Sequence, residues 1–269
     1  DLLRRLARLS LRTGKRGVGV RAGERRSVRR GQSQEFADHR PYVPGDDLRF
    51  LDWHLYGRLD TLWVKLFEEE DDRVVQLLID ASASMEGEKV EYARQIAAAL
   101  AFVALGQSDR ISVASLNDDV VQYAPPRRGR RSAKLVFETL EAVHPGGPTN
   151  LQRATERLPR QRGSGIVLLF TDFLYPDGPD VALKRLLARG NAVHVFHVLA
   201  PVELNPDLQG DYVLVDAESG EELDVTLDAE VLETYQTTVL AWADEMRTTC
   251  QRLGVGYTRL LTSVPVEDV

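Results

Sequence analysis

The sequence predicts an α/β fold: a doubly wound, mostly parallel sheet flanked by helices, with a small β-rich companion subdomain. Residues 74–79 and 166–170 are short and nearly continuous apolar runs. Such runs are typical of parallel strands that are buried on both faces. After the first run, strand patterns alternate with helical patterns, which is the arrangement of a doubly wound sheet.

The other elements follow in chain order. Helical patterns cover about 89–105, 132–143, 179–189 and 228–253, and another helix is expected to begin after the tight loop at 146–150. Strand patterns cover 61–67, 111–116, 120–123, 192–199 and 257–261. Residues 212–215 and 221–225 predict a hairpin around Ser219 and Gly220, which we expect to pair with 61–67 in the small β subdomain.

Charge and composition divide the chain near residue 72. Residues 1–72 hold a basic arm and a segment of unusual composition, and residues 73–269 hold the α/β domain, with a hairpin insertion near 205–227. The arm, residues 1–31, carries eleven Lys or Arg against two acidic residues. Its local charge is therefore +9, and the net charge of −7 leaves −16 on the rest of the chain.

A basic arm of this kind can contact nucleic acid, an anionic membrane surface or an acidic protein face, or lie on the chain's own acidic body. No aromatic residue lies between the basic ones, as a base-stacking strip would require. The sequence therefore makes no strong case for nucleic-acid binding.

Residues 31–61 combine a Pro-Gly turn with many charges. Asp46 or Asp47 is expected to cap a short helix. The apolar face of that helix would consist of Leu48, Leu51, Trp53 and Leu55. Charges of both signs are dense enough for an ion-pair network, which we expect to be structural rather than a binding face. The charged residues are Asp38, His39, Arg40, Asp46, Asp47, Arg49, Asp52 and Arg58.

Composition indicates an ordinary globular chain, with 43% hydrophobic and 28% charged residues. No apolar run approaches the roughly 18 residues of a membrane span. The single cysteine, Cys250, excludes an internal disulfide and is expected to be a small buried hydrophobic residue. We therefore expect a cytoplasmic protein, with no transmembrane segment in this chain.

Five oxygen-bearing side chains are expected to meet at one edge of the sheet. Asp80, Ser82 and Ser84 follow the first buried strand, spaced by two, and Asp172 follows the second. Thr149 lies in a Gly-Gly-Pro loop at the start of a helix. Because the carboxyl ends of parallel strands share one edge of a sheet, we expect these side chains to converge there.

Three hydroxyls and two carboxylates suit Mg²⁺, which takes six oxygen ligands at about 2.0–2.1 Å and retains several waters. Mn²⁺ and Ca²⁺ are the alternative ions. With so few charged ligands the ion stays electron-poor, and a vacant position on it would favour an outside carboxylate. The site is therefore predicted to bind an Asp or Glu of a partner protein.

This set of residues resembles the metal-ion-dependent adhesion site of von Willebrand factor type A domains, whose pattern is Asp-x-Ser-x-Ser, then Thr, then Asp. Asp80, Ser82, Ser84, Thr149 and Asp172 all match. The resemblance implies that the serines and the threonine contact the metal directly, and that the carboxylates act mainly through water. Pro148 departs from the pattern, since it lies directly before Thr149.

The chain is also similar, over nearly its whole length, to the bacterial domain of unknown function 58 family. The similarity rests on RPYVPGDD at 40–47, on Arg49, Asp52 and Trp53, on DASASM at 80–85, and on LGVGY at 253–257 and TSVP at 262–265. Members of that family are commonly associated with MoxR-type AAA+ ATPases and are thought to assist complex assembly or maturation. The resemblance implies a MoxR-type partner and a role of that kind.

Catalysis has less support. Position 82 is Ser where an aspartyl-phosphate phosphatase would need Asp, and Ser164 lacks the nucleophile-elbow pattern. His194 and His197 are expected to be satisfied core residues. We therefore predict a non-enzymatic protein-binding module. The alternatives are a Mg²⁺-dependent phosphate- or ester-processing enzyme and nucleic-acid binding through the basic arm.

Overall fold

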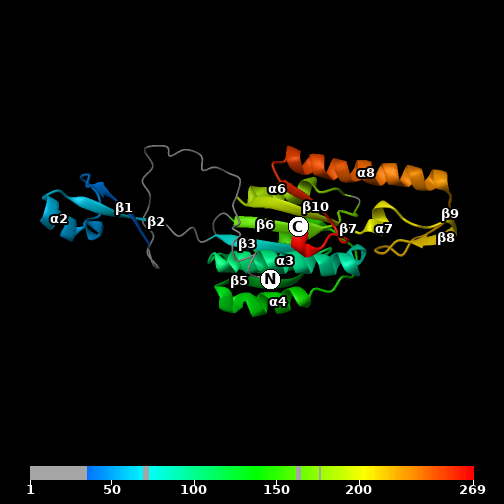
Figure 1. The fold of residues 1–269 in the computed structure, drawn as a ribbon, viewed down its shortest axis with the longest axis horizontal. Helices are drawn as coiled ribbons and strands as arrows, with labels where there is room; N and C mark the ends of the chain where they lie inside the picture. The colour runs from blue at the N-terminus through cyan, green and yellow to red at the C-terminus, as the bar shows by residue number, and fades with distance from the viewer. Residues whose placement is uncertain (1–34, 69–72, 162–164, 176) are drawn as a thin grey trace. The chain divides into compact units, whose positions relative to one another are not determined.

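The computed structural model describes residues 35–68, 73–161, 165–175 and 177–269 (Figure 1). The described residues fall into two compact units, 35–68 and 73–269. Within them, no helix has both the length and the apolar character that are needed to cross a membrane. The basic arm, residues 1–31, lies outside the described residues.

The larger unit is built on a six-stranded sheet with the order β10-β7-β6-β3-β4-β5. Neighbouring strands run parallel except β4 and β5, which are antiparallel. The mostly parallel α/β sheet predicted from the sequence is therefore confirmed. The strands are β3 (Val74–Asp80), β4 (Arg110–Leu116), β5 (Val120–Arg128), β6 (Gly165–Thr171), β7 (Ala192–Leu199) and β10 (Gly256–Leu261).

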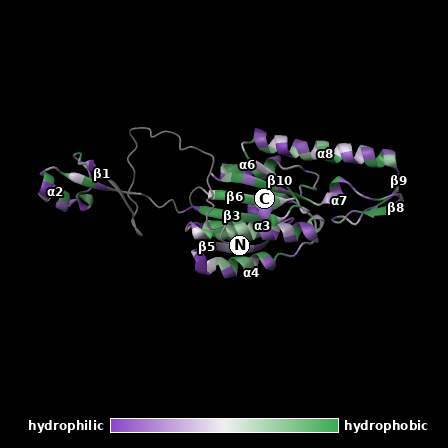
Figure 2. Cartoon of the chain, in the orientation of Figure 1, coloured by the Kyte–Doolittle hydropathy of each residue, from purple (hydrophilic) through white to green (hydrophobic). Residues whose placement is uncertain are grey.

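Helices cover both faces of this sheet (Figure 1). One face packs against α3 (Glu88–Gly106) and α4 (Ala133–Glu141). The other packs against α5 (Leu151–Arg157), α6 (Asp180–Ala188) and α8 (Ala229–Arg252). Because side chains alternate along a strand, Leu77 of β3 enters the first core and Leu78 enters the second. Figure 2 shows β3 and β6 as hydrophobic along most of their length.

The predicted hairpin is present, but its predicted pairing is wrong. Strands β8 (Gly210–Val215) and β9 (Glu222–Leu227) pair with each other in a two-stranded sheet of their own. They belong to the larger unit, whereas the strand at 61–67 lies in the smaller one. A short helix that the sequence did not predict, α7 (Pro201–Leu204), precedes the hairpin, and α8 follows it.

The smaller unit is an antiparallel pair, β1 (Glu35–Pro41) and β2 (Trp63–Glu68), joined through α2 (Trp53–Leu59). Asp52 caps α2, because its Oδ1 accepts hydrogen bonds from the backbone N–H groups of His54 and Leu55, both at 3.0 Å. Asp47 caps the preceding 3-10 turn, Leu48–Phe50, by accepting a hydrogen bond from the backbone N–H of Arg49 at 3.0 Å. The second cap, at Asp52, starts a new helix after this turn, and the apolar face shifts accordingly. Leu51 is buried, but Leu48 and Trp53 are 58% and 63% exposed, so the predicted apolar face is wrong for those two residues.

The charged residues of this unit form local pairs. Arg40 donates two hydrogen bonds of 2.7 Å to Asp46 and lowers the pKa of that carboxyl to about 2. Arg49 pairs with Asp47. Asp52 Oδ2 lies 2.9 Å from His39 Nε2 and 3.4 Å from Lys65 Nζ. These pairs hold the turn and the start of α2.

Candidate metal site at the carboxyl edge of the sheet

The strand order reverses between β3 and β6. From β3 the chain runs outward through β4 and β5, and it returns to β3's other side at β6 before continuing to β7 and β10. In open α/β sheets, ligands bind in the crevice beyond the carboxyl ends of the strands at such a reversal. Asp80 is the last residue of β3, and Asp172 directly follows β6. The topology therefore places both predicted carboxylates at the reversal.

Asp80 is fully buried at the centre of this edge. Its Oδ1 accepts a hydrogen bond from the backbone N–H of Ser82 at 3.0 Å, and its Oδ2 accepts one from the hydroxyl of Thr171 at 2.6 Å. Burial, followed by the negative charge of Asp172, raises the pKa of Asp80 to about 7. The negative charge of Asp172, which follows a different strand, therefore acts on Asp80.

Two loops bring the three predicted hydroxyls to the same edge. The backbone N–H of Ala83 donates to the carbonyl of Gly147 at 3.0 Å, which ties the serine loop to the Gly-Gly-Pro loop. Ser82 Oγ and Ser84 Oγ are 2.9 Å apart. The hydroxyls of Thr149 and Ser84 both donate hydrogen bonds to one carboxylate oxygen, that of Glu218, which is described below. Pro148 thus does not prevent the side chain of Thr149 from lying near that of Ser84.

Lys89, in the first turn of α3, is a neighbour of the site that the sequence did not reveal. Its side chain is buried, and its Nζ lies 2.7 Å from Asp172 Oδ2 and also pairs with Glu203. Burial alone would lower the pKa of Lys89, but the carboxylates of Asp172 and Glu203 raise it overall. The only signal in the sequence is a lysine at the start of the helix that follows the serine loop.

His197 supports the backbone at Asp172. Its Nε2 lies 2.9 Å from the carbonyl oxygen of Asp172, and its Nδ1 lies 2.7 Å from the hydroxyl of Tyr257. Burial lowers the pKa of His197 to about 4, so the ring is neutral at ordinary pH. His194 likewise has a partner, the hydroxyl of Thr258 at 2.9 Å. Both histidines have hydrogen-bond partners, as predicted, but only His197 is fully buried, and His194 is half-buried.

Glu218, in the turn between β8 and β9, is the second residue that the sequence did not reveal. Its Oε1 accepts hydrogen bonds from the hydroxyls of Thr149, at 2.7 Å, and Ser84, at 3.2 Å. Its Oε2 accepts one from the backbone N–H of Thr149 at 2.8 Å. Nothing in the local sequence separates Glu218 from Glu221 and Glu222, because only the packing of distant segments distinguishes them.

The five predicted residues thus lie at one edge of the sheet, but their role as metal ligands stays a prediction. In the part of the chain that the structure describes, no group of three or more His, Cys, Asp or Glu side chains could hold a metal ion. The predicted site is of another kind, because three of its five ligands are hydroxyls. Oxygen donors of this kind suit Mg²⁺.

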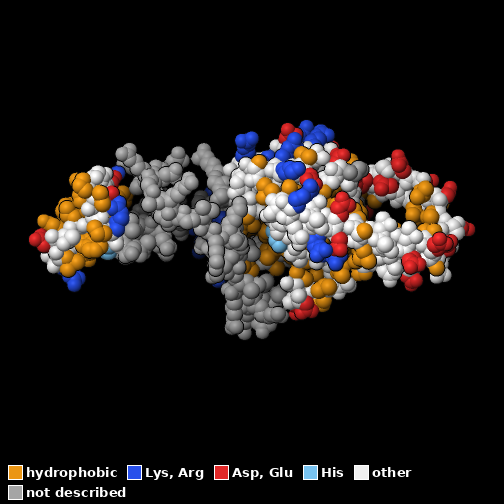
Figure 3. Space-filling view, turned by 90° about the horizontal axis from the view of Figure 1, so that it is seen from above, with side chains coloured by type: hydrophobic (Ala, Val, Ile, Leu, Met, Phe, Trp, Pro, Cys, Tyr) orange, Lys and Arg blue, Asp and Glu red, His pale blue; other side chains and the backbone are white. Residues whose placement is uncertain are grey.

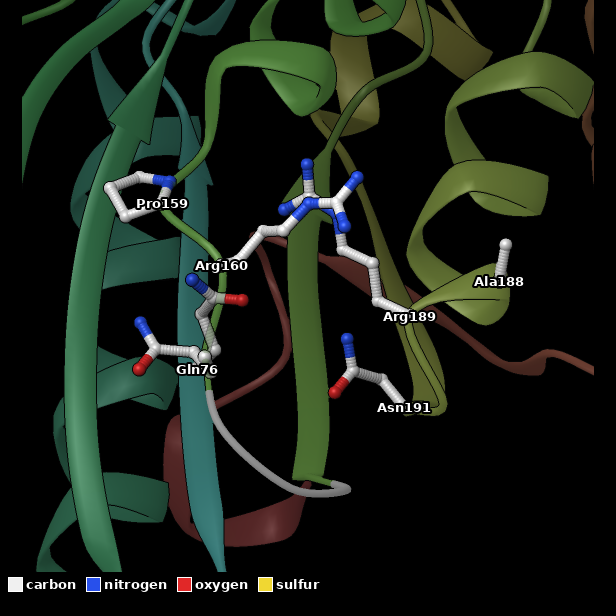
Figure 4. A pocket seen from close by; sticks show the side chains of 7 residues that line it. Gln76, Pro159, Arg160, Ala188, Arg189 and Asn191 are labelled. Atoms are coloured by element: carbon white, nitrogen blue, oxygen red, sulfur yellow. The ribbon is translucent and has the colours of Figure 1, made fainter.

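A separate cavity of about 260 Å³ lies beside the first half of β3 (Figure 4). The guanidinium groups of Arg160 and Arg189 lie close together in it. Arg189 donates to the backbone carbonyls of Thr155 and Leu158, at 2.7 and 3.1 Å, and so satisfies the end of α5. The cavity contains none of the five predicted residues. Its lining consists of Gln76, Pro159, Arg160, Gln161, Ala188, Arg189 and Asn191.

Comparisons with known proteins match most of the chain. A family model described as "Protein of unknown function DUF58" matches residues 38–244. "Uncharacterized protein Rv1480" of Mycobacterium tuberculosis (strain ATCC 25618 / H37Rv) is 30% identical over 256 residues, which cover 91% of this chain and 80% of the relative. "Uncharacterized protein Mb1516" of Mycobacterium bovis matches to the same extent.

Solved structures give more remote likenesses. The conserved hypothetical protein BatB from Bacteroides thetaiotaomicron is 19% identical, with a TM-score of 0.45, over 73% of this chain and 94% of that one. The vWF domain of the type V pili tip protein Mfa5 from Porphyromonas gingivalis is 11% identical, with a TM-score of 0.36, over 73% and 92%. These likenesses add no functional information to the geometry of the site.

Proposed function

The chain belongs to the DUF58 family of proteins of unknown function, and we propose that it is a protein-binding module, not an enzyme, that holds an acidic residue of a partner through Mg²⁺. The ligand set is Asp80, Ser82, Ser84, Thr149 and Asp172. In the adhesion sites that this set resembles, the hydroxyls contact the metal and the carboxylates act mainly through water. The ion supplies positive charge and a coordination position that an outside carboxylate can take.

One observation carries the proposal: two of the hydroxyls at this edge already donate hydrogen bonds to a carboxylate from outside the five residues. Glu218 Oε1 lies 2.7 Å from the hydroxyl of Thr149 and 3.2 Å from that of Ser84. Neighbouring ligands of an octahedral Mg²⁺ ion are about 2.9 Å apart, as follows from metal–oxygen distances of about 2.0–2.1 Å. Oxygens with the observed spacing can share one ion after little movement.

The charge balance of the edge also supports a cation. Four carboxylates, those of Asp80, Asp172, Glu203 and Glu218, are connected through the contacts described above, and Lys89 supplies one positive charge among them. Buried charges are costly unless they are compensated. A divalent ion would provide the compensation that one ammonium group does not.

Tyr175 provides a further polar atom for a hydrated ion. Its hydroxyl is buried and has no hydrogen-bond partner among the residues that the structure describes. Burial, followed by the negative charges of Asp80 and Asp172, raises the pKa of Tyr175 well above its usual value. A water of the ion's hydration shell would give this hydroxyl the partner that buried polar groups normally have.

For the partner, the family resemblance supports a MoxR-type AAA+ ATPase, with the pair acting in the assembly or maturation of protein complexes. The recognised feature would be an Asp or Glu side chain that completes the coordination of the ion. The single cysteine supports a reducing compartment, and we place the interaction in the cytoplasm.

A pull-down from a lysate of the source organism tests this proposal. The baits are the wild type in Mg²⁺, the wild type in EDTA, Asp80→Ala in Mg²⁺, and Asp224→Ala in Mg²⁺ as a control, since Asp224 is an exposed aspartate of β9. The proposal predicts that an AAA+ ATPase or a client protein is recovered with the wild type and with the control, in Mg²⁺ only. Equal recovery under all four conditions would move the interface elsewhere.

A further inference from the structure

The β8–β9 hairpin is exposed along most of its length, and its turn contains one residue that is not. From residue 209 to residue 224 every side chain is exposed apart from that of Glu218, which is half-buried. An isolated two-stranded hairpin is only marginally stable in water. The hydrogen bonds of Glu218 to Ser84 and Thr149 therefore have a large part in fixing the position of the turn.

The turn is built to present Glu218. Asp216 Oδ1 accepts hydrogen bonds from the backbone N–H groups of Glu218, at 3.1 Å, and Ser219, at 2.6 Å. The hydroxyl of Ser219 donates to the same oxygen at 2.8 Å. Gly220 closes the turn with a φ of +73°, a conformation that glycine adopts without strain. The backbone at Glu218 is thus held in one conformation before its side chain meets the site.

We infer that Glu218 is an internal acidic ligand of the site, which occupies the position of a partner's carboxylate until the partner displaces it. This inference rests on the proposed function, because it takes the same edge to be where a partner's acidic residue binds. The contacts of Glu218 involve Ser84 and Thr149, two of the three predicted hydroxyl ligands. Two carboxylates cannot share those donors, so internal and external ligands exclude each other.

The negative charge of the segment around Glu218 makes the contact between Glu218 and the site depend on the ion. Residues 205–242 contain ten Asp or Glu and no Lys or Arg. The end of the larger unit formed by β8, β9 and the start of α8 accordingly shows acidic but no basic side chains in this view (Figure 3). Since the segment supplies no cation for Glu218, a Mg²⁺ ion at the edge would draw the turn toward the site and strengthen its docking.

Glu218 is attached to the same chain as the site, and this attachment determines how strongly it competes with a partner's carboxylate. A ligand on a short tether has an effective concentration of the order of millimolar. A partner with a single weak acidic contact would therefore be excluded, whereas a partner with additional contacts would displace the turn. The class of partner that fits is an acidic peptide segment that offers Asp or Glu together with a further binding surface.

Binding of a short acidic probe to the full chain tests the inference. The probe is a fluorescein-labelled, amidated peptide of residues 216–220. Its control, the Gln peptide, carries Gln in place of Glu218 and Asn in place of Asp216, so that it offers no side-chain carboxylate. Anisotropy is measured for the wild type, Glu218→Ala and Glu222→Ala, where Glu222 is an exposed glutamate of the same hairpin. In Mg²⁺, Glu218→Ala should bind the acidic peptide at least about tenfold more tightly than the other two. The Gln peptide should not bind.

Hydrogen exchange of residues 210–227 in the full chain gives a second readout. Mg²⁺ should slow exchange of the hairpin in the wild type and in Glu222→Ala but not in Glu218→Ala. Equal peptide affinity and equal hairpin exchange in all three proteins would overturn the inference. If Mg²⁺ still binds the wild type and not Asp80→Ala in that case, the proposed function stands without it. Absence of Mg²⁺ binding in every variant would overturn both.

Discussion

Glu218 and Thr149, which are 69 residues apart in the sequence, are joined by two hydrogen bonds. The backbone N–H of Thr149 donates to Glu218 Oε2 at 2.8 Å, and its hydroxyl donates to Oε1 at 2.7 Å. Hydrogen bonds to a charged acceptor are stronger than those between neutral groups. A residue predicted to hold a metal thus already holds a carboxylate, which is the chemical group that the metal is proposed to bind.

The first prediction concerns Asp80. Asp80→Ala should remove Mg²⁺ binding, measured by isothermal titration calorimetry, because the carboxylate lies at the centre of the proposed ligand set. The far-ultraviolet circular dichroism spectrum should be retained. Asp224→Ala, which changes an exposed aspartate, should bind Mg²⁺ as the wild type does. Undiminished Mg²⁺ binding by Asp80→Ala would show that the ion, if bound, is held elsewhere.

The second prediction concerns pH. The pKa of Asp80 in the metal-free protein is raised to about 7, so below pH 7 a proton occupies the carboxylate that the ion needs. One proton is then released for each ion bound, and the affinity for Mg²⁺ should fall by about tenfold per pH unit below 7. Above about pH 8 the affinity should be constant. Calorimetry in buffers of different ionisation enthalpy counts the released proton, and equal affinities at pH 6 and pH 8 would contradict the assignment.

The third prediction concerns Lys89, whose buried ammonium group lies between Asp172 and Glu203. Lys89→Met leaves two carboxylates without their counter-charge. We expect the free energy of unfolding of the metal-free protein to fall by about 3–5 kcal/mol, as when one partner of a buried ion pair is removed. Mg²⁺ should restore part of the loss, because it supplies positive charge beside Asp172. Denaturant unfolding with and without Mg²⁺ measures both effects.

Lys134→Met is the matched control for Lys89. The side chain of Lys134 is 86% exposed and lies 3.7 Å from Glu138 in an i,i+4 pair on α4. Exposed pairs of this kind contribute little, so the control should change stability by less than about 0.5 kcal/mol. Similar losses in the two variants would mean that the burial of Lys89 does not matter to stability.

The fourth prediction concerns Asp52 in the smaller unit. Asp52→Ala removes the cap of α2 and the contacts with His39 and Lys65, and should destabilise this unit by about 1–2 kcal/mol. Asp52→Ser keeps a capping oxygen and should lose less. Of the three tryptophans, only Trp242 lies in the larger unit. Fluorescence unfolding in a Trp242→Phe background therefore reports on the smaller unit alone.

Asp52 also gives this unit a pH dependence of known sign. The backbone N–H of Leu55, followed by His39, lowers the pKa of Asp52 below its usual value. Its stabilising contribution is therefore complete above the pKa of the unfolded chain and is lost as the pH falls through the lower folded value. Asp52→Ser should be less sensitive to acid than the wild type, and an identical acid response of the two would contradict this account.

The fold was largely predictable because its elements are specified by local patterns. Strand β7 has the predicted bounds, and α8 begins one residue after its predicted start, Asp228, whose side chain caps the helix by accepting a hydrogen bond from the backbone N–H of Val231. Cys250 is fully buried, as expected for a small hydrophobic residue. The prediction was wrong for the exposure of Leu48 and Trp53, since the second cap at Asp52 resets the phase of the helix, a change that propensity alone does not reveal.

The sequence by itself determined the alternation of strands and helices and the positions of Asp80, Ser82, Ser84, Thr149 and Asp172. Apolar runs, caps and the shared edge of parallel strands are properties of short segments, and short segments can be read directly. Only the tertiary structure decided that the hairpin forms a sheet of its own in the larger unit, that Lys89 meets Asp172, and that Glu218 meets Ser84 across 134 residues. These contacts join distant segments, and which exposed glutamate or lysine makes them depends on how the helices and the hairpin pack around the sheet.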